Sequence, residues 1–136
     1  MAFDRAVAAL TLYCEASNQP PETRRWIMHS VFNRARIGPA RYGPTVAAVC
    51  LKRAQYSEWD GDTVDNRNLE RAASAPDADA TMLDCLAAYD EVAGGASDPT
   101  RGATHFYADS IPAPYWTAQA TSCGKSGNIL FFKDVP

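Results

Sequence analysis

The sequence predicts a mainly α-helical (α+β) domain that carries a small β element near its carboxyl end. Three observations lead to this fold class. Apolar residues recur at helical spacing through much of residues 3–93, proline or glycine interrupts these segments, and short runs typical of strands occur only after residue 98. The chain has 136 residues, the usual length of one domain, so residues 1–136 are expected to form a single domain.

The first predicted helix is apolar on nearly all sides. Apolar side chains from Phe3 to Cys14 occupy both of its faces, and no charge lies between Arg5 and Glu15. Such a helix is expected to run through the centre of the domain. The Gln19-Pro20-Pro21 stretch cannot continue it, which places Glu15 in its last turn.

A second and a third helical segment follow at clear boundaries. Pro21 stands at a first helical position and Gly38-Pro39 ends that helix, so the second helix lies between them. Residues 45–50 form a short apolar helical stretch. Residues 51–66 are polar and irregular and predict a loop with aromatic anchors, and residues 68–75 predict a short helix.

The last third of the chain contains one long helix and then the β element. Asp77 or Asp79 caps the helix, and Gly94-Gly95 ends it. Its inward side chains are predicted to be Met82, Leu83, Leu86, Tyr89 and Val92. Residues 104–107 and 128–132 predict two short strands of a hairpin or strand pair.

Charge and hydropathy exclude two classes of partner. Thirteen Lys and Arg residues against sixteen Asp and Glu leave a net charge of −3, so no overall positive field attracts nucleic acid. No apolar run reaches the ~18 residues that a membrane-spanning helix needs, so no membrane insertion is expected. Residues 6–12 lack the flanks of a secretion signal, which predicts synthesis in the cytoplasm without a signal peptide.

The cysteine and histidine pattern predicts no metal site and no cofactor. The four cysteines are far apart, and neither of the two histidines lies at zinc-ligand spacing from them. Three cysteines fall in apolar helical patterns, where a reduced thiol acts as a small hydrophobic group. The cysteines are therefore predicted to be reduced core residues.

Glu15 is the strongest single candidate for chemistry. Desolvation and the negative end of the helix dipole both disfavour its charged form, so its pKa is expected to be raised. A carboxyl group that holds its proton near neutral pH is what a general acid requires. The alternative is that Glu15 reaches solvent or pairs with Arg24 or Arg34.

Two clusters combine hydrogen-bonding side chains with aromatic rings. They are Gln55-Tyr56-Ser57 and Thr104-His105-Phe106-Tyr107. This mixture holds sugars through their hydroxyl groups and their apolar ring faces. The alternative is that the rings close the core and that His105 is structural.

The chain resembles the SleB-type cell wall hydrolases, which cleave peptidoglycan and also occur as bacteriophage endolysins. The resemblance covers nearly the whole chain in order: Leu12-Tyr-Cys-Glu15-Ala16, Asn33-Arg34, Tyr42-Gly-Pro-Thr-Val46, Gln55-Tyr56-Ser57 and Asp98-Pro-Thr-Arg-Gly-Ala-Thr-His-Phe-Tyr107. The Gly-Ala-Thr-His-Phe-Tyr string is its most specific part. One departure is that the segment 127–132 lacks the histidine expected in the closing strand of the family.

The resemblance implies a lysozyme-like, goose-type lytic transglycosylase architecture with one essential glutamate at the end of a buried helix. In this sequence that residue is Glu15. The substrate-binding residues would be Gln55, Tyr56, Ser57, Thr104, His105 and Tyr107, with His105 bracing the cleft wall rather than transferring protons.

The number of suitable carboxylates favours one mechanism. Hydrolysis by inversion or retention needs two carboxyl groups flanking the bond. The possible second acids, Glu58, Asp60, Asp62, Asp98 and Asp109, all lie in polar loops where solvation or capping explains them. A lytic transglycosylase needs only Glu15 and gives 1,6-anhydro-muramic products from the bond between N-acetylmuramic acid and N-acetylglucosamine.

Three other functions stay open at this point. One is a muramidase with a second carboxylate, and another is a cysteine peptidase or amidase with Cys14 or Cys50 activated by His105. The third is a peptidoglycan-binding module that stacks sugars on Trp59, Tyr115 and Trp116. The expected setting is a monomeric phage endolysin that reaches the peptidoglycan in the periplasm after holin-dependent release and lyses the host.

Overall fold

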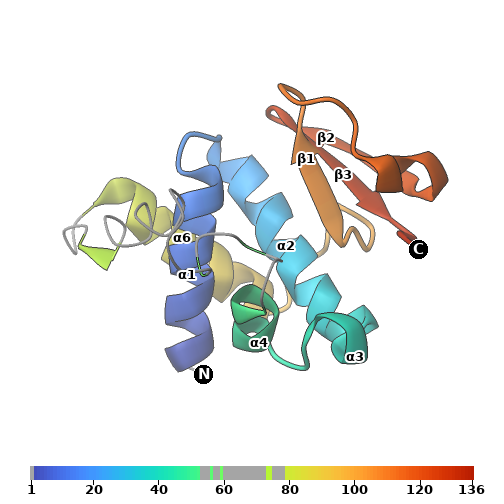
Figure 1. Cartoon of the computed structure of the whole chain (residues 1–136). Coiled ribbons are helices and arrows are strands. Elements are labelled where there is room, and N and C mark those ends of the chain that lie inside the picture. Colours follow the sequence, from blue (N-terminus) through green and yellow to red (C-terminus); the bar gives the residue numbers. More distant parts are fainter. Residues whose placement is uncertain (1, 53–55, 57–58, 60–72, 75–78) are drawn as a thin grey trace.

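The computed structural model describes residues 2–52, 56, 59, 73–74 and 79–136. Four helices pack against one another, and a three-stranded sheet lies on the far side of α2 from α1 (Figure 1). The fold class predicted from the sequence, mainly helical with a small β element, is confirmed.

Helices α1, α2, α4 and α6 begin and end close to the predicted boundary residues, and the short helix α3 was not predicted. Their bounds are α1 Ala2–Ala16, α2 Pro21–Ile37, α3 Pro39–Tyr42, α4 Val46–Leu51 and α6 Ala80–Ala93. Pro21 occupies the first turn of α2. The side chain of Thr45 caps α4 by accepting a hydrogen bond from the Ala48 N–H. Asp79 caps α6 in the same way, through the Met82 N–H, whereas Asp77 and most of the predicted helix 68–75 lie outside the described residues.

Helix α1 has the central position expected of an apolar helix. It contacts α2, α4 and α6, and it buries Val7, Ala8, Ala9, Leu12 and Ala16 among them. Its first turn lies at the edge of the core, since Phe3 is 60% exposed.

Helix α6 packs with a narrower face than predicted. Tyr89 and Val92 are buried, and Met82 and Leu86 are half-buried. The prediction that Leu83 points inward is wrong, because this side chain is 50% exposed. Leu83 and Cys85 stand two positions apart and so face different sides of a helix, and it is Cys85 that is fully buried.

The sheet is antiparallel with the order β1-β3-β2. Strands β1 (His105–Ala108) and β3 (Ile129–Lys133) coincide with the two predicted runs, and His105 lies opposite Phe132. Strand β2 (Thr121–Ser126) was not predicted, because its polar Thr-Ser-Cys-Gly-Lys-Ser sequence lacks the alternation of a half-buried strand. As an edge strand, β2 is largely exposed and needs little apolar surface.

The two faces of the sheet contact different parts of the chain. On the helical face, the fully buried Phe131 packs between Trp26 of α2 and Phe106, with ring centroids 5.2 and 5.8 Å away. Burial of one such side chain contributes about 2 kcal/mol to folding. On the other face, a short 3-10 helix, η2 (Tyr115–Gln119), places Trp116 against His105, Tyr107 and Phe132.

The cysteines are free thiols, as predicted. Cys50, Cys85 and Cys123 are buried, and Cys14 is half-buried. Burial raises the pKa of Cys85 to about 12, so this thiol is protonated and acts as a packing group. Within the described ranges, no helix has the length and apolar character needed to cross a bilayer.

Candidate functional site

Glu15 lies half-buried in the last turn of α1. The residues around it on the helix are buried: Thr11 and Leu12 one turn earlier are 2% exposed, and Ala16 is 0% exposed. A chain reversal of four residues then leads from α1 into α2 (Figure 1). Glu15 is thus neither fully solvated nor sealed in the core.

The turn between β2 and β3 packs against the connection between α1 and α2 and against the first turn of α2. The Gln19 side-chain oxygen accepts a hydrogen bond from the Asn128 N–H at 3.3 Å, and the hydroxyls of Thr23 and Ser126 are 2.9 Å apart. Gly127 between them has φ +55°, and a Cβ there would lie 2.7 Å from the polar side-chain atoms of both Gln19 and Thr23. Only glycine allows the hairpin to approach so closely, and the turn therefore lies near the start of α2, close in sequence to Glu15.

The two arginines that could have paired with Glu15 have other partners. The guanidinium group of Arg24 donates to the Asp84 carboxylate and to the Gln19 carbonyl, both at 2.7 Å. Arg34 donates to the Thr104 carbonyl at 2.5 Å and lies over the rings of Tyr42 and Tyr56.

The predicted Gln55-Tyr56-Ser57 cluster is described only at its centre. Tyr56 is buried, with its ring centroid 5.4 Å from the Arg34 guanidinium carbon. Trp59 donates from its indole nitrogen to the Thr11 hydroxyl at 2.7 Å. Tyr56 and Trp59 therefore attach their segment to α2 and α1, whereas Gln55 and Ser57 lie outside the described residues.

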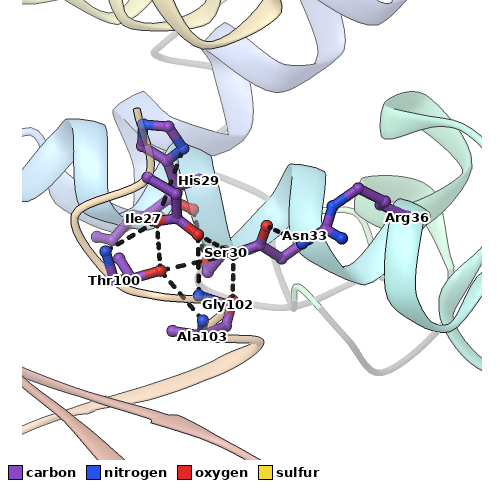
Figure 2. Close-up of polar contacts among 9 residues, drawn as sticks. Ile27, His29, Ser30, Asn33, Arg36, Thr100, Gly102 and Ala103 are labelled. Atoms are coloured by element: carbon purple, nitrogen blue, oxygen red, sulfur yellow. Dashed lines mark hydrogen bonds and ion pairs between the residues drawn. The ribbon is translucent and has the colours of Figure 1, made fainter. Parts of the chain in front are cut away.

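The Asp98-Pro-Thr-Arg-Gly-Ala segment forms a hydrogen-bonded loop on α2. The Asp98 carboxylate accepts hydrogen bonds from the N–H groups of Thr100 and Gly102, from the Thr100 hydroxyl, and from the Asn33 amide at 2.8 Å. Asn33 also donates to the Ala103 carbonyl at 3.0 Å (Figure 2). These bonds fix the loop that leads into β1.

The same network determines the charge of its ionisable groups. Burial disfavours the Asp98 carboxylate, but the hydrogen bonds from Thr100, Asn33 and Gly102 outweigh it and hold the pKa below the usual 3.8. Burial also lowers the pKa of His29 below 6.5, and this outweighs the attraction of Asp98, whose carboxylate oxygen is 3.8 Å from His29 Nδ1. Asp98 is thus charged and His29 neutral at pH 7.

Thr104 and His105 lie where β1 begins, against the last turn of α2. Thr104 is 5% exposed, and its hydroxyl is 2.9 Å from His105 Nδ1. The imidazole ring contacts Tyr42 on one side and Trp116 on the other. His105, Tyr115 and Trp116 border a cavity of about 360 Å³. Burial and the positive charges of Arg34 and Arg41 lower the pKa of His105 to about 4, so it is neutral at pH 7.

Tyr107 lies on the same face of β1 as His105. Its ring stacks on Phe132 with centroids 5.7 Å apart and meets the edge of Trp116. The structure therefore brings Thr104, His105 and Tyr107 together on one strand.

The structure does not place Thr104 and His105 beside Glu15. Arg34, which holds Thr104, is separated from Thr23 by eleven residues of α2, or about 16 Å of helix. Tyr107 lies further along β1, toward the hairpin turn.

The polar face of α2 was not predicted as an anchor, and only Asn33 and Arg34 were noted, as part of the family resemblance. Its inward side is lined by four buried polar residues in two pairs at helical spacing, His29, Ser30, Asn33 and Arg34. Polar residues at i, i+4 positions on the apolar side of a helix are the sequence signal that could have located this anchor. Within the described part of the chain, no three His, Cys, Asp or Glu side chains form a group that could hold a metal ion.

Comparisons with known proteins agree with this architecture. A family model described as Cell Wall Hydrolase matches residues 18–132. The catalytic domain of the Bacillus cereus SleB protein matches the fold with a TM-score of 0.75 at 18% identity, over 98% of this chain and 91% of that chain. The catalytic domain of a germination-specific lytic transglycosylase, SleB from Bacillus anthracis, gives a TM-score of 0.74 at 18% identity, over 98% and 96%. No curated protein matches the sequence.

Proposed function

The chain belongs to the cell wall hydrolase family, and on this premise we propose that it is a lytic transglycosylase with Glu15 as its acid. The bond cleaved is the β-1,4 bond between N-acetylmuramic acid and N-acetylglucosamine. The observation that carries this proposal is the position of Glu15: half-buried, in the last turn of an apolar helix, four residues before Gln19, whose side chain bonds to the β2–β3 turn. Partial desolvation and the helix dipole both favour its protonated form.

The reaction needs only this carboxyl group. Protonated Glu15 donates its proton to the glycosidic oxygen as the bond to muramic C1 breaks, which frees the N-acetylglucosamine hydroxyl. The resulting carboxylate then removes the proton from the muramic C6 hydroxyl, and O6 closes on C1 to give the 1,6-anhydro sugar. Glu15 ends protonated and no water is consumed.

Two of the candidate second acids lie within the described residues, and both are engaged elsewhere. Asp98 is held by Asn33, Thr100 and Gly102 against α2, and Asp109 pairs with Lys125 at 2.9 Å. Neither is a free carboxylate that could activate a water across a sugar from Glu15. Glu58, Asp60 and Asp62 lie outside the described residues.

The substrate-orienting residues are proposed with different roles. Tyr107 presents its phenol edge on the strand face beside Trp116, and Gln55 and Ser57 supply further hydrogen bonds to the sugar. Thr104 and His105 brace the strand, because the Thr104 carbonyl and the His105 ring already have partners within the protein.

Product mass tests the reaction type. Purified peptidoglycan digested by the protein should release fragments with 1,6-anhydro-muramic ends, each lighter by one water than a hydrolysis product. Fragments with reducing ends alone would show a muramidase and would require a second acid.

The other two functions have less support from the described residues. For a cysteine peptidase, Cys50 is fully buried, and His105 contacts Thr104, Tyr42 and Trp116. For a binding module, Tyr115 is 93% exposed, but the indole of Trp59 is bonded to Thr11. Insensitivity to iodoacetamide and release of soluble fragments would exclude the peptidase and the binding module, respectively.

A role in host lysis is proposed as the biological setting. Expression of the chain together with a holin that opens the inner membrane should clear a bacterial culture. Expression of the Glu15→Gln variant with the same holin should leave the walls intact.

A further inference from the structure

A second cavity lies at the far end of α2 from Glu15. It has a volume of about 490 Å³ and is enclosed by the last turn of α2, by α3, by the loop before β1 and by the end of β3. Thr23 and Arg36 are thirteen residues apart on α2, so about 20 Å of helix separates the Glu15 end of the helix from this cavity.

The cavity is lined by four cationic side chains and one acidic one: Arg36, Arg41, Arg101, Lys133 and Asp134. Elsewhere on the described chain, Arg5, Arg24, Arg25 and Lys125 form ion pairs with carboxylates. The cavity therefore concentrates positive charge in a protein whose net charge is −3.

The cavity cations are held in place by neutral oxygens. Arg36 donates to the Asn33 amide oxygen at 3.3 Å, Arg101 donates to the Cys123 carbonyl at 3.2 Å, and Lys133 donates to the Arg101 carbonyl at 3.4 Å. Arg41 donates to the backbone oxygens of Val135 and Pro136. For Arg36, Arg101 and Lys133, these bonds orient the side chains while leaving their charge available to a ligand.

Backbone strain is concentrated at the same place. Among the described residues other than glycine, the two with positive φ are Arg101 at 56° and Asp134 at 55°, and both line the cavity. A left-handed conformation costs about 1 kcal/mol or more for such residues and is found where the surrounding structure imposes it, often at binding sites. The Asp98 bonds to Thr100 and Gly102 impose it at Arg101.

We propose that this cavity binds the free carboxylates of peptidoglycan stem peptides. The inference rests on the proposed function, since these peptides branch from the glycan strand that the enzyme would bind. Arginine side chains suit carboxylates through paired N–H donors. A half-open cavity of about 490 Å³ fits a short anionic branch, whereas a phosphate polymer would need cations spread along a stripe.

The peptide in the cavity would not come from the sugar undergoing cleavage. A stem peptide of five residues spans at most about 17 Å when fully extended, which is shorter than the helix length between the two sites. The cavity would therefore take a peptide from another muramic acid of the bound wall and would increase affinity for peptide-bearing walls.

Binding of a synthetic stem tetrapeptide to the full chain, measured by calorimetry or NMR titration, tests the proposal. The matched probe is the same peptide with its carboxylates converted to carboxamides. Arg101→Asn tests the cavity because asparagine tolerates the left-handed backbone, and Lys133→Gln is a second, independent variant. Lys125→Gln removes one charge outside the cavity, from β2, and serves as the control.

We expect the tetrapeptide to bind more tightly than its carboxamide form, with each cavity variant weakening it about tenfold and Lys125→Gln changing it less than twofold. On intact peptidoglycan, Arg101→Asn should raise KM without changing kcat, and walls stripped of stem peptides by an amidase should remove this difference. Equal binding of the two peptides, or tight binding of inorganic phosphate or an oligonucleotide but not of the tetrapeptide, would overturn the proposal. The titration measures peptide binding without any turnover. Its outcome is therefore independent of the product analysis that tests the proposed function.

Discussion

The end of α1 and the loop at Asp98 differ in how clearly the sequence identifies them. The Asp98 loop is fixed by hydrogen bonds from Asn33, Thr100 and Gly102, and it contains part of the most recognisable stretch of the sequence. Glu15 stands half-buried at a helix end, in a short and unspecific motif. The distinctive sequence around Asp98 thus reflects the hydrogen bonds that this loop requires. Glu15, the residue proposed for chemistry, is recognised by its position at the end of an apolar helix.

The largest expected effect separates these two regions by activity. Glu15→Gln removes the proposed acid while keeping size and hydrogen-bonding capacity, so release of soluble peptidoglycan fragments should fall by about 10²–10⁴-fold. The melting temperature should stay within a few degrees of the parent protein. Glu22→Gln, an exposed change in the first turn of α2, is the control and should retain activity. Substantial lysis by Glu15→Gln at normal melting temperature would remove Glu15 from its proposed role.

Removal of the Asp98 carboxylate should give the opposite result, a loss of stability. Asp98→Ala leaves the N–H groups of Thr100 and Gly102 and the Asn33 amide without their acceptor, which should cost about 2–4 kcal/mol in the free energy of unfolding. Urea denaturation measures this. Asp90→Ala breaks only the exposed pair with Arg5 and should cost less than about 1 kcal/mol. Similar unfolding midpoints for the two variants would contradict the anchoring role of Asp98.

A smaller effect concerns the pH dependence of stability at His105. The pKa of His105 is about 4 in the folded protein and 6.5 in the unfolded chain. Between these two pH values the unfolded chain binds a proton that the folded chain does not. Stability from this group is therefore complete above pH 6.5 and is lost as pH falls toward 4. One pKa unit corresponds to about 1.4 kcal/mol, and for this half-buried ring we expect a loss of about 1 kcal/mol.

Urea midpoints measured at pH 7 and pH 5 check this expectation. His105→Asn should reduce the difference between the two midpoints, and His29, whose pKa is also lowered by burial, should account for part of what remains. An unchanged difference in the His105→Asn variant would show that the ring titrates normally.

The smallest expected effect tests the sugar-binding face of β1. Tyr107→Phe removes one hydroxyl but keeps the ring that stacks on Phe132, so turnover should fall by about tenfold or less. Gln55→Ala is expected to fall in the same range. Tyr115→Phe, at a 93% exposed ring, is the control. A loss for Tyr107→Phe as large as that for Glu15→Gln would make Tyr107 part of the chemistry and weaken the single-carboxylate mechanism.

Local signals in the sequence predicted helices α1, α2, α4 and α6, two of the strands and the position of Glu15 at a helix end. These features depend on local signals, because proline, glycine and capping side chains set helix boundaries, and apolar spacing sets the buried face of a helix such as α1. The edge strand β2 was missed, because its polar sequence pairs only through the backbone of β3. The outward position of Leu83 was missed because the local pattern does not define how wide a face α6 buries.

The contacts between polar residues that are distant in the sequence depend on the folded chain. Asn33 and Asp98 are 65 positions apart in the sequence and are joined by a hydrogen bond. Arg101 and Asp134, the two described residues other than glycine with positive φ, line one cavity with Arg36 only when β3 lies beside α2. Contacts of this kind depend on the closure of long loops. In the folded chain, burial lowers the pKa of His105, whereas hydrogen bonds from Thr100, Asn33 and Gly102 hold Asp98 ionised against the effect of its own burial. No local pattern contains these distances, so the anchoring role of the Asp98 loop and the cationic cavity emerged only from the folded chain.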